Sequence, residues 1–320
     1  MPRVSVIVPS YNRAQMLPRA LESIFAQTYK DYEVIVVDDG SKDETPEVMK
    51  QFLGRVKYIR KENGGSASAR NRGIEESGGK YIAFLDSDDY WVPEKLEVQV
   101  QVLDAHPNVG IVYARMPIIN DKGERVGTKP AGISGRNFKE LLEHWGDLPT
   151  STVMTRRECF EKAGKFDTAL TTMQDIDMWL RIARHYDLYE IESKVLAYYS
   201  RHGEQITSSK IKVYGGLVTI YKKILKTFDD APKDLMHRRI ALHQYMLSRS
   251  YYDEGFYGPA WQNLTEVLRH YPHVGILLFQ EGDTPLKKSF KIIKPYVYFA
   301  VCSLKALISM PQRLVRSKAK

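Results

Sequence analysis

Three carboxylates at the end of one apolar segment are the strongest chemical signal in this chain. Residues 81–85 form an apolar run that indicates a buried strand. Asp86, Asp88 and Asp89 follow it directly. Carboxylates this close repel one another, and their hard oxygen atoms suit Mg²⁺ or Mn²⁺. The same pattern also fits a solvated turn whose aspartates cap the next helix, so the neighbouring segments decide between the two.

The first 115 residues alternate β-rich and helical segments. The β-rich segments cover residues 3–8, 32–37, 56–59, 81–85 and 109–114. The helical segments between them cover residues 13–27, 44–52, 66–76 and 93–104. This alternation predicts a mostly parallel sheet with helices on its faces. In such a sheet a ligand binds beyond the carboxyl ends of the strands.

Four consecutive predicted strand ends carry small, polar or acidic residues. They are Pro9-Ser10-Tyr11-Asn12, Asp38-Asp39-Gly40-Ser41, Asn63-Gly64-Gly65 and the aspartate cluster. Each segment alone is consistent with an ordinary turn, but the four together would line one crevice. In that crevice Tyr11 would offer an aromatic face to a base, and Asp39 would accept a hydrogen bond from a base or ribose. Arg70 would meet a carbonyl or phosphate, although alone it would read as a surface helix residue.

Two common phosphate-binding motifs are absent from the sequence. It contains no GxxxxGK[ST], so a P-loop is unsupported. It also lacks GxGxxG after the first predicted strand, where a dinucleotide-binding fold would need it. A cation held by Asp88 is then the available means of neutralising phosphates.

Four separated segments resemble glycosyltransferase family 2. They are VSVIVPSYNR, DYEVIVVDDGSKDET, NGGSASARNRGIEESGGKYIAFLDSDD and QDIDMWLR, within about residues 3–205. The family has the GT-A fold, a Rossmann-like α/β domain with a mostly parallel sheet flanked by helices. The resemblance implies an inverting, metal-dependent transferase. It would move a sugar from a nucleoside-diphosphate donor, expected to be a UDP-sugar, to a hydroxyl of a glycan or lipid-linked acceptor, in bacterial cell-surface polysaccharide synthesis.

The resemblance also implies which residues hold the nucleotide. One of Asp38 and Asp39 contacts it, and we select Asp39. Pro9, Tyr11 and Arg70 are expected in the same nucleotide-binding set.

A metal site follows from the same resemblance. Asp86 and Asp88 match the two acids of the family's DxD element. Asp88 is expected to bind Mn²⁺ or Mg²⁺ directly, and Asp86 to contact the nucleotide's ribose or a metal-bound water. His202, in the sequence YSRH, matches a position from which a histidine can approach the metal or the diphosphate. Outside that context, a lone histidine is usually a surface or core residue.

The segment MQDIDMWLRIARHYD predicts a helix that begins near Asp175. Where this chain has Gln174-Asp175 the family usually has Glu-Asp, and its Asp is the general base. The resemblance therefore assigns to Asp175 the removal of the acceptor proton. An acid favoured by the helix dipole is the alternative. Asp177 points about 200° away from Asp175 on a helix and cannot share its site. Trp179 is expected in the core.

The remaining segments predict supporting structure. NDKG, beginning at Asn120, predicts a hairpin turn, and a glycine-rich loop with Gly127, Gly132 and Gly135 follows it. We expect a catalytic domain over residues 1–207 and an all-α region over residues 208–320. Its helices are expected at 213–228, 235–253 and 258–270. The segment around the last two resembles a tetratricopeptide unit, and a generic helical hairpin fits equally.

The positive charge of the chain is concentrated at its C-terminal end. The net charge of +8 arises from residues 284–320, which contain nine Lys or Arg and no Asp or Glu. No general nucleic-acid surface is therefore implied. Residues 286–310 combine an apolar stripe with Lys291, Lys294 and Lys305, too many for a membrane span. The stripe predicts a helix lying on the membrane surface, with packing on protein as the alternative.

Cysteine content and the N-terminal segment bear on location. Cys159 and Cys302 are far apart and suggest neither a disulfide framework nor a zinc site. Residues 1–10 lack the features of a signal peptide. We therefore expect a cytoplasmic enzyme, peripheral at the inner face of the cell membrane.

Two other functions fit parts of the sequence. A metal-dependent nucleotidyltransferase also uses an acidic crevice, but it would favour a Gly/Arg/Lys-rich phosphate loop where this chain has PSYNR. A non-catalytic, membrane-recruited scaffold with a degenerate transferase domain is the second alternative. Intact Asp39, Asp86, Asp88 and Asp175 argue against it.

Overall fold

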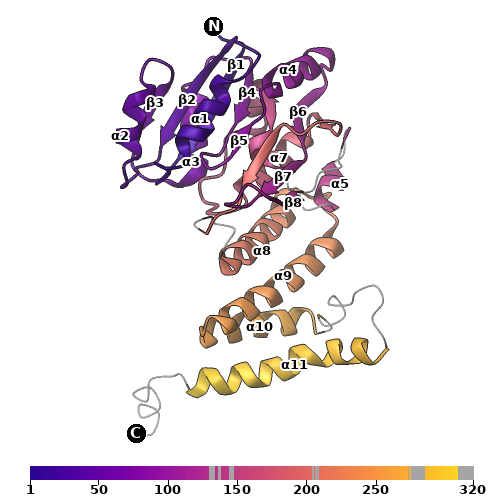
Figure 1. Cartoon of the computed structure of the whole chain (residues 1–320). Helices are drawn as coiled ribbons and strands as arrows, with labels where there is room; N and C mark the ends of the chain where they lie inside the picture. Colours follow the sequence, from indigo (N-terminus) through magenta and orange to yellow (C-terminus); the bar gives the residue numbers. More distant parts are fainter. Residues whose placement is uncertain are drawn as a thin grey trace. The chain divides into compact units, whose positions relative to one another are not determined.

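A computed structural model describes most of the chain. The described residues are 1–129, 134–135, 138–143, 148–203, 205, 209–272, 274 and 285–308. The chain divides into two compact units, Met1–Gly203 and Glu204–Lys320 (Figure 1). The boundary that we expected, at residue 207, lies outside the described residues.

The first unit is built on a mostly parallel sheet, as predicted. Within the described residues its strand order is β10-β6-β9-β4-β1-β2-β3. The strands are β1 Val4–Ser10, β2 Tyr32–Asp38, β3 Lys57–Arg60, β4 Tyr81–Phe84, β6 Val109–Ala114, β9 Met154–Arg156 and β10 Asp187–Ile191. Strand β1 pairs in parallel with both β2 and β4. Strand β9 runs antiparallel between β4 and β6.

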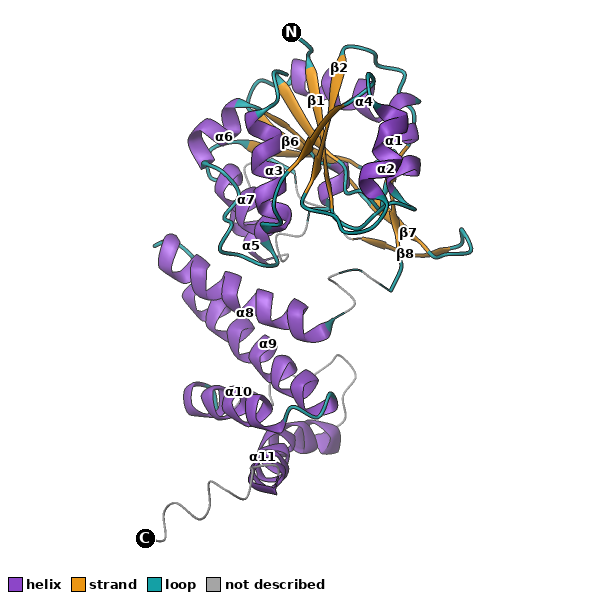
Figure 2. Cartoon of the chain, turned by 90° about the vertical axis from the view of Figure 1, so that its left-hand side faces the viewer, coloured by secondary structure: helices purple, strands orange, loops and turns teal. Residues whose placement is uncertain are grey.

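Helices cover both faces of this sheet. They are α1 Leu17–Phe25, α2 Thr45–Met49, α3 Gly65–Glu75, α4 Lys95–Ala105, α5 Phe138–Glu143, α6 Glu158–Ala163 and α7 Gln174–Ala183. Two short 3₁₀ turns are η1 Lys50–Phe52 and η2 Thr150–Thr152. Figure 2 shows α3, α6 and α7 on one side of the strands and α1 on the other. The sheet is therefore the middle layer of the unit.

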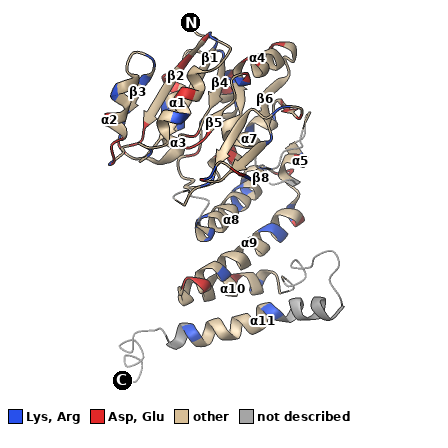
Figure 3. Cartoon of the chain, viewed as in Figure 1, with Lys and Arg blue, Asp and Glu red and all other residues tan. Residues whose placement is uncertain are grey.

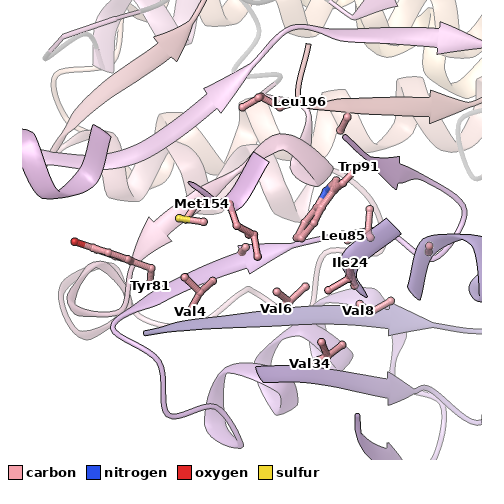
Figure 4. Close-up of a cluster of buried hydrophobic side chains, with 14 of the residues drawn as sticks. Val4, Val6, Val8, Ile24, Val34, Tyr81, Leu85, Trp91, Met154 and Leu196 are labelled. Carbon is pink, nitrogen blue, oxygen red and sulfur yellow. The ribbon is translucent and has the colours of Figure 1, made fainter. Parts of the chain in front are cut away.

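Strand β1 shows how alternation of side chains builds the two layers. Val4, Val6 and Val8 are buried in one cluster with Ile24 of α1 (Figure 4). Burying such a side chain contributes about 1.5–3 kcal/mol. Ile7 points to the opposite face, toward α3. A Cβ atom on Gly73 would lie 2.4 Å from Ile7 Cγ2, so a glycine is required where α3 approaches β1.

A second, smaller sheet has the order β5-β11-β7-β8 within the described residues. Its strands are β5 Tyr90–Trp91, β7 Met116–Ile119, β8 Arg125–Lys129 and β11 Ala197–Ser200. Strands β7 and β8 form the hairpin predicted from NDKG, with Gly123 at φ 78°. Gly127 was expected in a loop, but it lies in β8 opposite Ile118. Gly132 lies outside the described residues, and Gly135 forms a bridge with Leu188.

The second unit is all-helical, as predicted. Its helices are α8 Lys210–Thr227, α9 Lys233–Asp253, α10 Tyr257–His270 and α11 Pro285–Ile308. Each packs on the next along the chain (Figure 1). Tyr245, Ala260, Leu264, Tyr298 and Cys302 belong to one buried cluster formed by α9, α10 and α11. None of the described helices is both long and apolar enough to span a bilayer.

Candidate active site

The loops that follow β1 and β2 are tied together by hydrogen bonds. The Asn12 amide donates to Ser41 Oγ at 2.9 Å, and Asn12 Oδ1 accepts from the Lys42 amide at 2.8 Å. Asn12 has φ 52°, a left-handed conformation that asparagine tolerates. Pro9 is buried in β1 opposite Val37, whereas the Tyr11 side chain is exposed. The hydrogen bonds of Asn12 thus hold the loop that contains Tyr11 against the loop that follows β2.

The two aspartates at the end of β2 have different surroundings. Asp38 is fully buried and accepts hydrogen bonds from the Ser41 amide at 2.8 Å and Tyr58 Oη at 2.7 Å. Burial and this contact with Asp38 raise the pKa of Tyr58. These contacts make Asp38 a structural residue at the strand end.

Asp39 lies at the start of α3. Its carboxylate accepts from Lys61 Nζ at 2.6 Å and from the amides of Gly64 and Gly65 at 3.0 and 2.7 Å. A negative charge at a helix N-terminus is favoured by the helix dipole. Both carboxylate oxygens are therefore engaged, and a base or ribose would use their remaining lone pairs or displace Lys61.

Arg70 is buried and paired with Asp86. Its Nη2 atom donates to Asp86 Oδ1 at 2.6 Å, and its guanidinium lies 5.7 Å from the ring of Phe166. Arg70 is thus not a surface helix residue. The charge-assisted bond orients the Asp86 carboxylate at the end of β4. Arg70 and Asp86 were each predicted from the sequence to lie in the nucleotide site, and the structure shows that they are in direct contact.

Asp88 and His202 meet although they are far apart in sequence. His202 Nε2 lies 2.9 Å from Asp88 Oδ2. The antiparallel pairing of β5 with β11 matches Tyr90 with Tyr198. This pairing carries the residues before β5 and after β11 to the same end of the small sheet. The contact between His202 and Asp88 therefore has a simple topological cause.

Two arginines outside the set of residues predicted from the sequence also reach Asp88. Arg13 Nε lies 3.6 Å from Asp88 Oδ2. Arg19 Nη2 donates to the Asp88 carbonyl at 3.0 Å and to Ser200 Oγ at 2.6 Å. Two guanidinium groups thus lie beside the proposed metal and diphosphate position.

Asp89 is a buried anchor of the acidic loop. Its carboxylate accepts from Ser151 Oγ at 2.5 Å and from the Ser200 amide at 3.1 Å. Burial, reinforced by the charges of Asp88 and Asp86, raises the pKa of Asp89 well above its usual range. Of the three clustered acids, Asp89 therefore points into the protein.

Asp175 lies at the first turn of α7, as predicted. Its Oδ2 atom accepts from Thr150 Oγ1 at 3.1 Å. Asp177 instead pairs with Arg181 at 2.8 Å, which agrees with the opposite directions expected for the two acids. Trp179 is fully buried and packs against Phe166, so its predicted place in the core is confirmed.

The turn η2 connects these groups and was missed from sequence. Ser151 Oγ accepts from the Asp86 amide at 3.1 Å and donates to Asp89, while the Ser151 carbonyl accepts from Trp91 Nε1 at 2.7 Å. The adjacent Thr150 holds Asp175. The run of small hydroxyl residues in PTST was the available signal.

Residues 5–164 match the family description "Glycosyl transferase family 2". The chain belongs to glycosyltransferase family 2. An uncharacterized glycosyltransferase of Rickettsia prowazekii is 31% identical over 255 residues, which cover 77% of this chain and 78% of the relative. The Escherichia coli UDP-Glc:alpha-D-GlcNAc-diphosphoundecaprenol beta-1,3-glucosyltransferase WfgD is 30% identical, with 65% of this chain and 81% of the relative covered.

Solved structures of low identity share the fold of this glycosyltransferase. Residues 1–349 of Staphylococcus aureus TarS in complex with UDP give a TM-score of 0.62 at 20% identity, covering 96% of this chain and 92% of that one. The mannosyltransferase PcManGT of Pyrobaculum calidifontis, in complex with GDP-Man and Mn²⁺, gives 0.58 at 21% identity, covering 96% and 86%. The predicted family and GT-A fold are therefore confirmed.

The residues at Asp88 fit a divalent cation whose ligands come partly from the protein and partly from the substrate. Asp88 Oδ2 and His202 Nε2 lie 2.9 Å apart, at direct hydrogen-bond distance. This spacing is also close to the roughly 3 Å between neighbouring ligands of an octahedral Mg²⁺, so the two atoms could bind one cation in place of their hydrogen bond. Over the described part of the chain, no three His, Cys, Asp or Glu side chains gather into a possible metal site. Water and diphosphate oxygens would have to complete the coordination, a common arrangement for Mg²⁺.

Proposed function

We propose that this family 2 glycosyltransferase moves a sugar, with inversion, from a nucleoside-diphosphate donor to a hydroxyl of a glycan or lipid-linked acceptor. One observation carries the proposal. Thr150 and Ser151 are consecutive in the chain; the first bonds Asp175, and the second bonds the loop that contains Asp86 and Asp88. A candidate base and a candidate donor site are thereby joined through one short turn.

The donor site would be built from the strand ends. Tyr11 would stack on the base, and Asp39 would accept from the base or ribose. Arg13 and Arg19 would place positive charge beside the diphosphate, where it strengthens charge-assisted hydrogen bonds. The UDP in the TarS structure and the UDP-Glc in the name of WfgD support a UDP-sugar as the donor.

Asp88 and His202 would hold Mn²⁺ or Mg²⁺. The Mn²⁺ in the PcManGT complex supports metal use. A cation bound there would stabilise the negative charge of the departing diphosphate. Asp86, fixed by Arg70, would contact the ribose or a water molecule beside the cation.

Asp175 would act as the general base. It would take the proton of the acceptor hydroxyl as that oxygen attacks the anomeric carbon. The new glycosidic bond forms on the face opposite the diphosphate, whose bond to the anomeric carbon breaks. A single displacement of this kind inverts the configuration and requires no covalent intermediate with the protein.

Family membership argues against a nucleotidyltransferase, and the Asp88–His202 and Thr150–Asp175 contacts argue against a degenerate scaffold. The acceptor class is supported by WfgD, whose name specifies a diphosphoundecaprenol acceptor. An acceptor of this kind would place the enzyme peripherally at the inner face of the cell membrane.

Two asparagine substitutions test the assignment together. Asp88→Asn should weaken Mn²⁺-dependent UDP binding by about tenfold or more, because a charged metal ligand is lost. Asp175→Asn should leave UDP binding intact but lower turnover by about 10²–10⁴-fold. Calorimetry with UDP and Mn²⁺, followed by assays with UDP-sugars and polyprenyl-diphosphate glycans, provides both readouts. Loss of UDP binding in Asp175→Asn would sink its assignment as the base.

A further inference from the structure

Among the described side chains of helix α11, one apolar face packs on protein and another is exposed. Tyr298 and Cys302 are buried with Tyr245 and Ala260 in the cluster shared with α9 and α10. The apolar stripe in residues 286–310 predicted either a membrane-facing surface or a face packed on protein. The structure shows packing on one side of α11, and the described members of the predicted stripe lie on another side.

The second face remains open to solvent. Val297, Val301 and Leu304 are 58%, 39% and 61% exposed. They are spaced i, i+4 and i+7, so they form one stripe along the helix. Aliphatic side chains this exposed, in a row, are unusual on a protein surface that contacts only water.

Two aromatic side chains extend this stripe. Trp261 of α10 is exposed, and its Nε1 atom donates to Ser303 Oγ of α11 at 3.0 Å. Tyr296 is also exposed, and its hydroxyl donates to the Pro272 carbonyl at 2.5 Å. Tryptophan and tyrosine favour the membrane–water interface, because each combines an apolar ring with a polar group.

The charge beside this face has one sign. Residues 284–320 carry nine Lys or Arg and no Asp or Glu. Figure 3 shows basic residues and no acidic residue on the described part of α11. The stripe lies next to Lys294 and Lys305 in the helical sequence, and Lys305 also lies over the ring of Tyr252 at 4.6 Å. Apolar residues flanked by lysines are typical of helices that bind anionic lipid.

We propose that an exposed face of the helical unit, formed by Trp261, Tyr296, Val297, Val301 and Leu304, docks the protein on an anionic membrane surface. A second copy of the chain is disfavoured as the occupant, because two such faces would bring like charges together. The inference deepens the proposed function, since this surface would hold the enzyme where a lipid-linked acceptor lies. Lipid binding itself does not require activity, so the two proposals can fail separately.

The test uses the full chain and vesicles of defined composition. Val297→Gln, Val301→Gln and Leu304→Gln are combined in one variant. The matched control combines Leu53→Gln, Val126→Gln and Val195→Gln in the first unit, where these side chains are 61%, 44% and 37% exposed. Removing α11 would be a poor test, because Tyr298 and Cys302 belong to the helical core.

Co-sedimentation with phosphatidylglycerol–phosphatidylcholine vesicles should show binding of the wild type and the control. The stripe variant should bind at least about tenfold more weakly, because it lacks three apolar side chains that would insert into the membrane surface. Binding of the wild type should fall at high salt and on pure phosphatidylcholine. Melting temperature and UDP binding should be unchanged in the stripe variant.

Three outcomes would overturn the proposal. The first is that the wild type remains in the supernatant with anionic vesicles at low salt. The second is that the stripe variant binds the vesicles as tightly as the control. Alternatively, sedimentation velocity would show a wild-type dimer that the stripe variant converts to monomer, which would identify a contact between copies. If the stripe variant loses vesicle binding but keeps its transfer activity on a soluble acceptor, the result would support membrane docking separately from the proposed reaction.

Discussion

Thr150 Oγ1 donates a hydrogen bond to Asp175 Oδ2 across 3.1 Å. The two residues lie on different elements, η2 and α7, so the bond fixes the direction of a carboxylate that would otherwise rotate at the start of a helix. Asp175 also accepts from the Ile176 amide through its other oxygen. A general base works only when it lies within hydrogen-bond reach of the proton that it removes. Thr150 is therefore a positioning residue for the proposed base.

Replacement of Thr150 should affect turnover but not donor binding. Thr150→Val keeps the shape of the side chain and removes the donor, so kcat should fall by about 10–100-fold through misplacement of the base. Thr150→Ser retains the hydroxyl and should restore most of the rate. Steady-state kinetics and UDP calorimetry on both variants measure the two effects. Equal losses in the Val and Ser variants would show that packing, rather than the hydrogen bond, matters at this position.

Ser151 performs a second task in the same turn. Its hydroxyl donates to buried Asp89 and accepts from the Asp86 amide, so Ser151→Ala removes two buried bonds. Leaving such groups unsatisfied costs about 1–3 kcal/mol or more. We expect lower stability in urea and weaker Mn²⁺-dependent UDP binding, because the loop carrying Asp86 and Asp88 loses its anchor.

A matched control for Ser151→Ala is available at the end of β1. Ser10 is also buried, but its hydroxyl makes no hydrogen bond to the described residues. Ser10→Ala should therefore change stability little. Similar losses of stability in the two variants would contradict the role assigned to Ser151.

The sequence alone predicted those strands that carry an apolar pattern within their own residues. Strands β1 and β4 are buried throughout and β2 is buried from Val34 onward, and each contains a short apolar run. Strand β9 has only three residues, and its place between β4 and β6 depends on partners at least 40 positions away. Such a strand has no pattern of its own to detect.

The same distinction applies to the site. Asp88 and Asp175 could be selected as candidate site residues because motifs of the family carry them. Arg19 was missed because it belongs to α1 and reaches the Asp88 carbonyl only after the chain has folded. Ser151 was missed for a similar reason, since its partners lie 62 and 65 residues away. Residues that support other residues are defined by tertiary contacts, which a single sequence does not display.

Lys95 provides a prediction that depends on pH. It is fully buried in α4, where Nζ lies 2.6 Å from Gln99 Oε1 and 4.0 Å from the centre of the Trp91 ring. The amide oxygen and the ring favour the ammonium form, but neither carries the full negative charge that would offset its desolvation. Burial therefore lowers the pKa of Lys95 well below its ordinary value.

The sign of the effect on stability follows from proton binding. The unfolded chain keeps the Lys95 proton up to about pH 10.4, whereas the folded chain releases it at a lower pH. Between these two pKa values the unfolded state binds more protons, so the free energy of unfolding should rise with pH, by up to about 1.4 kcal/mol per unit. Lys95→Met removes this contribution, and urea unfolding from pH 7 to 10 should show the wild type gaining stability relative to the variant. Lys122→Met, at an exposed turn, is the control and should run parallel to the wild type. Parallel curves for all three proteins would mean that Lys95 keeps its proton in the folded state, held by Gln99 and Trp91.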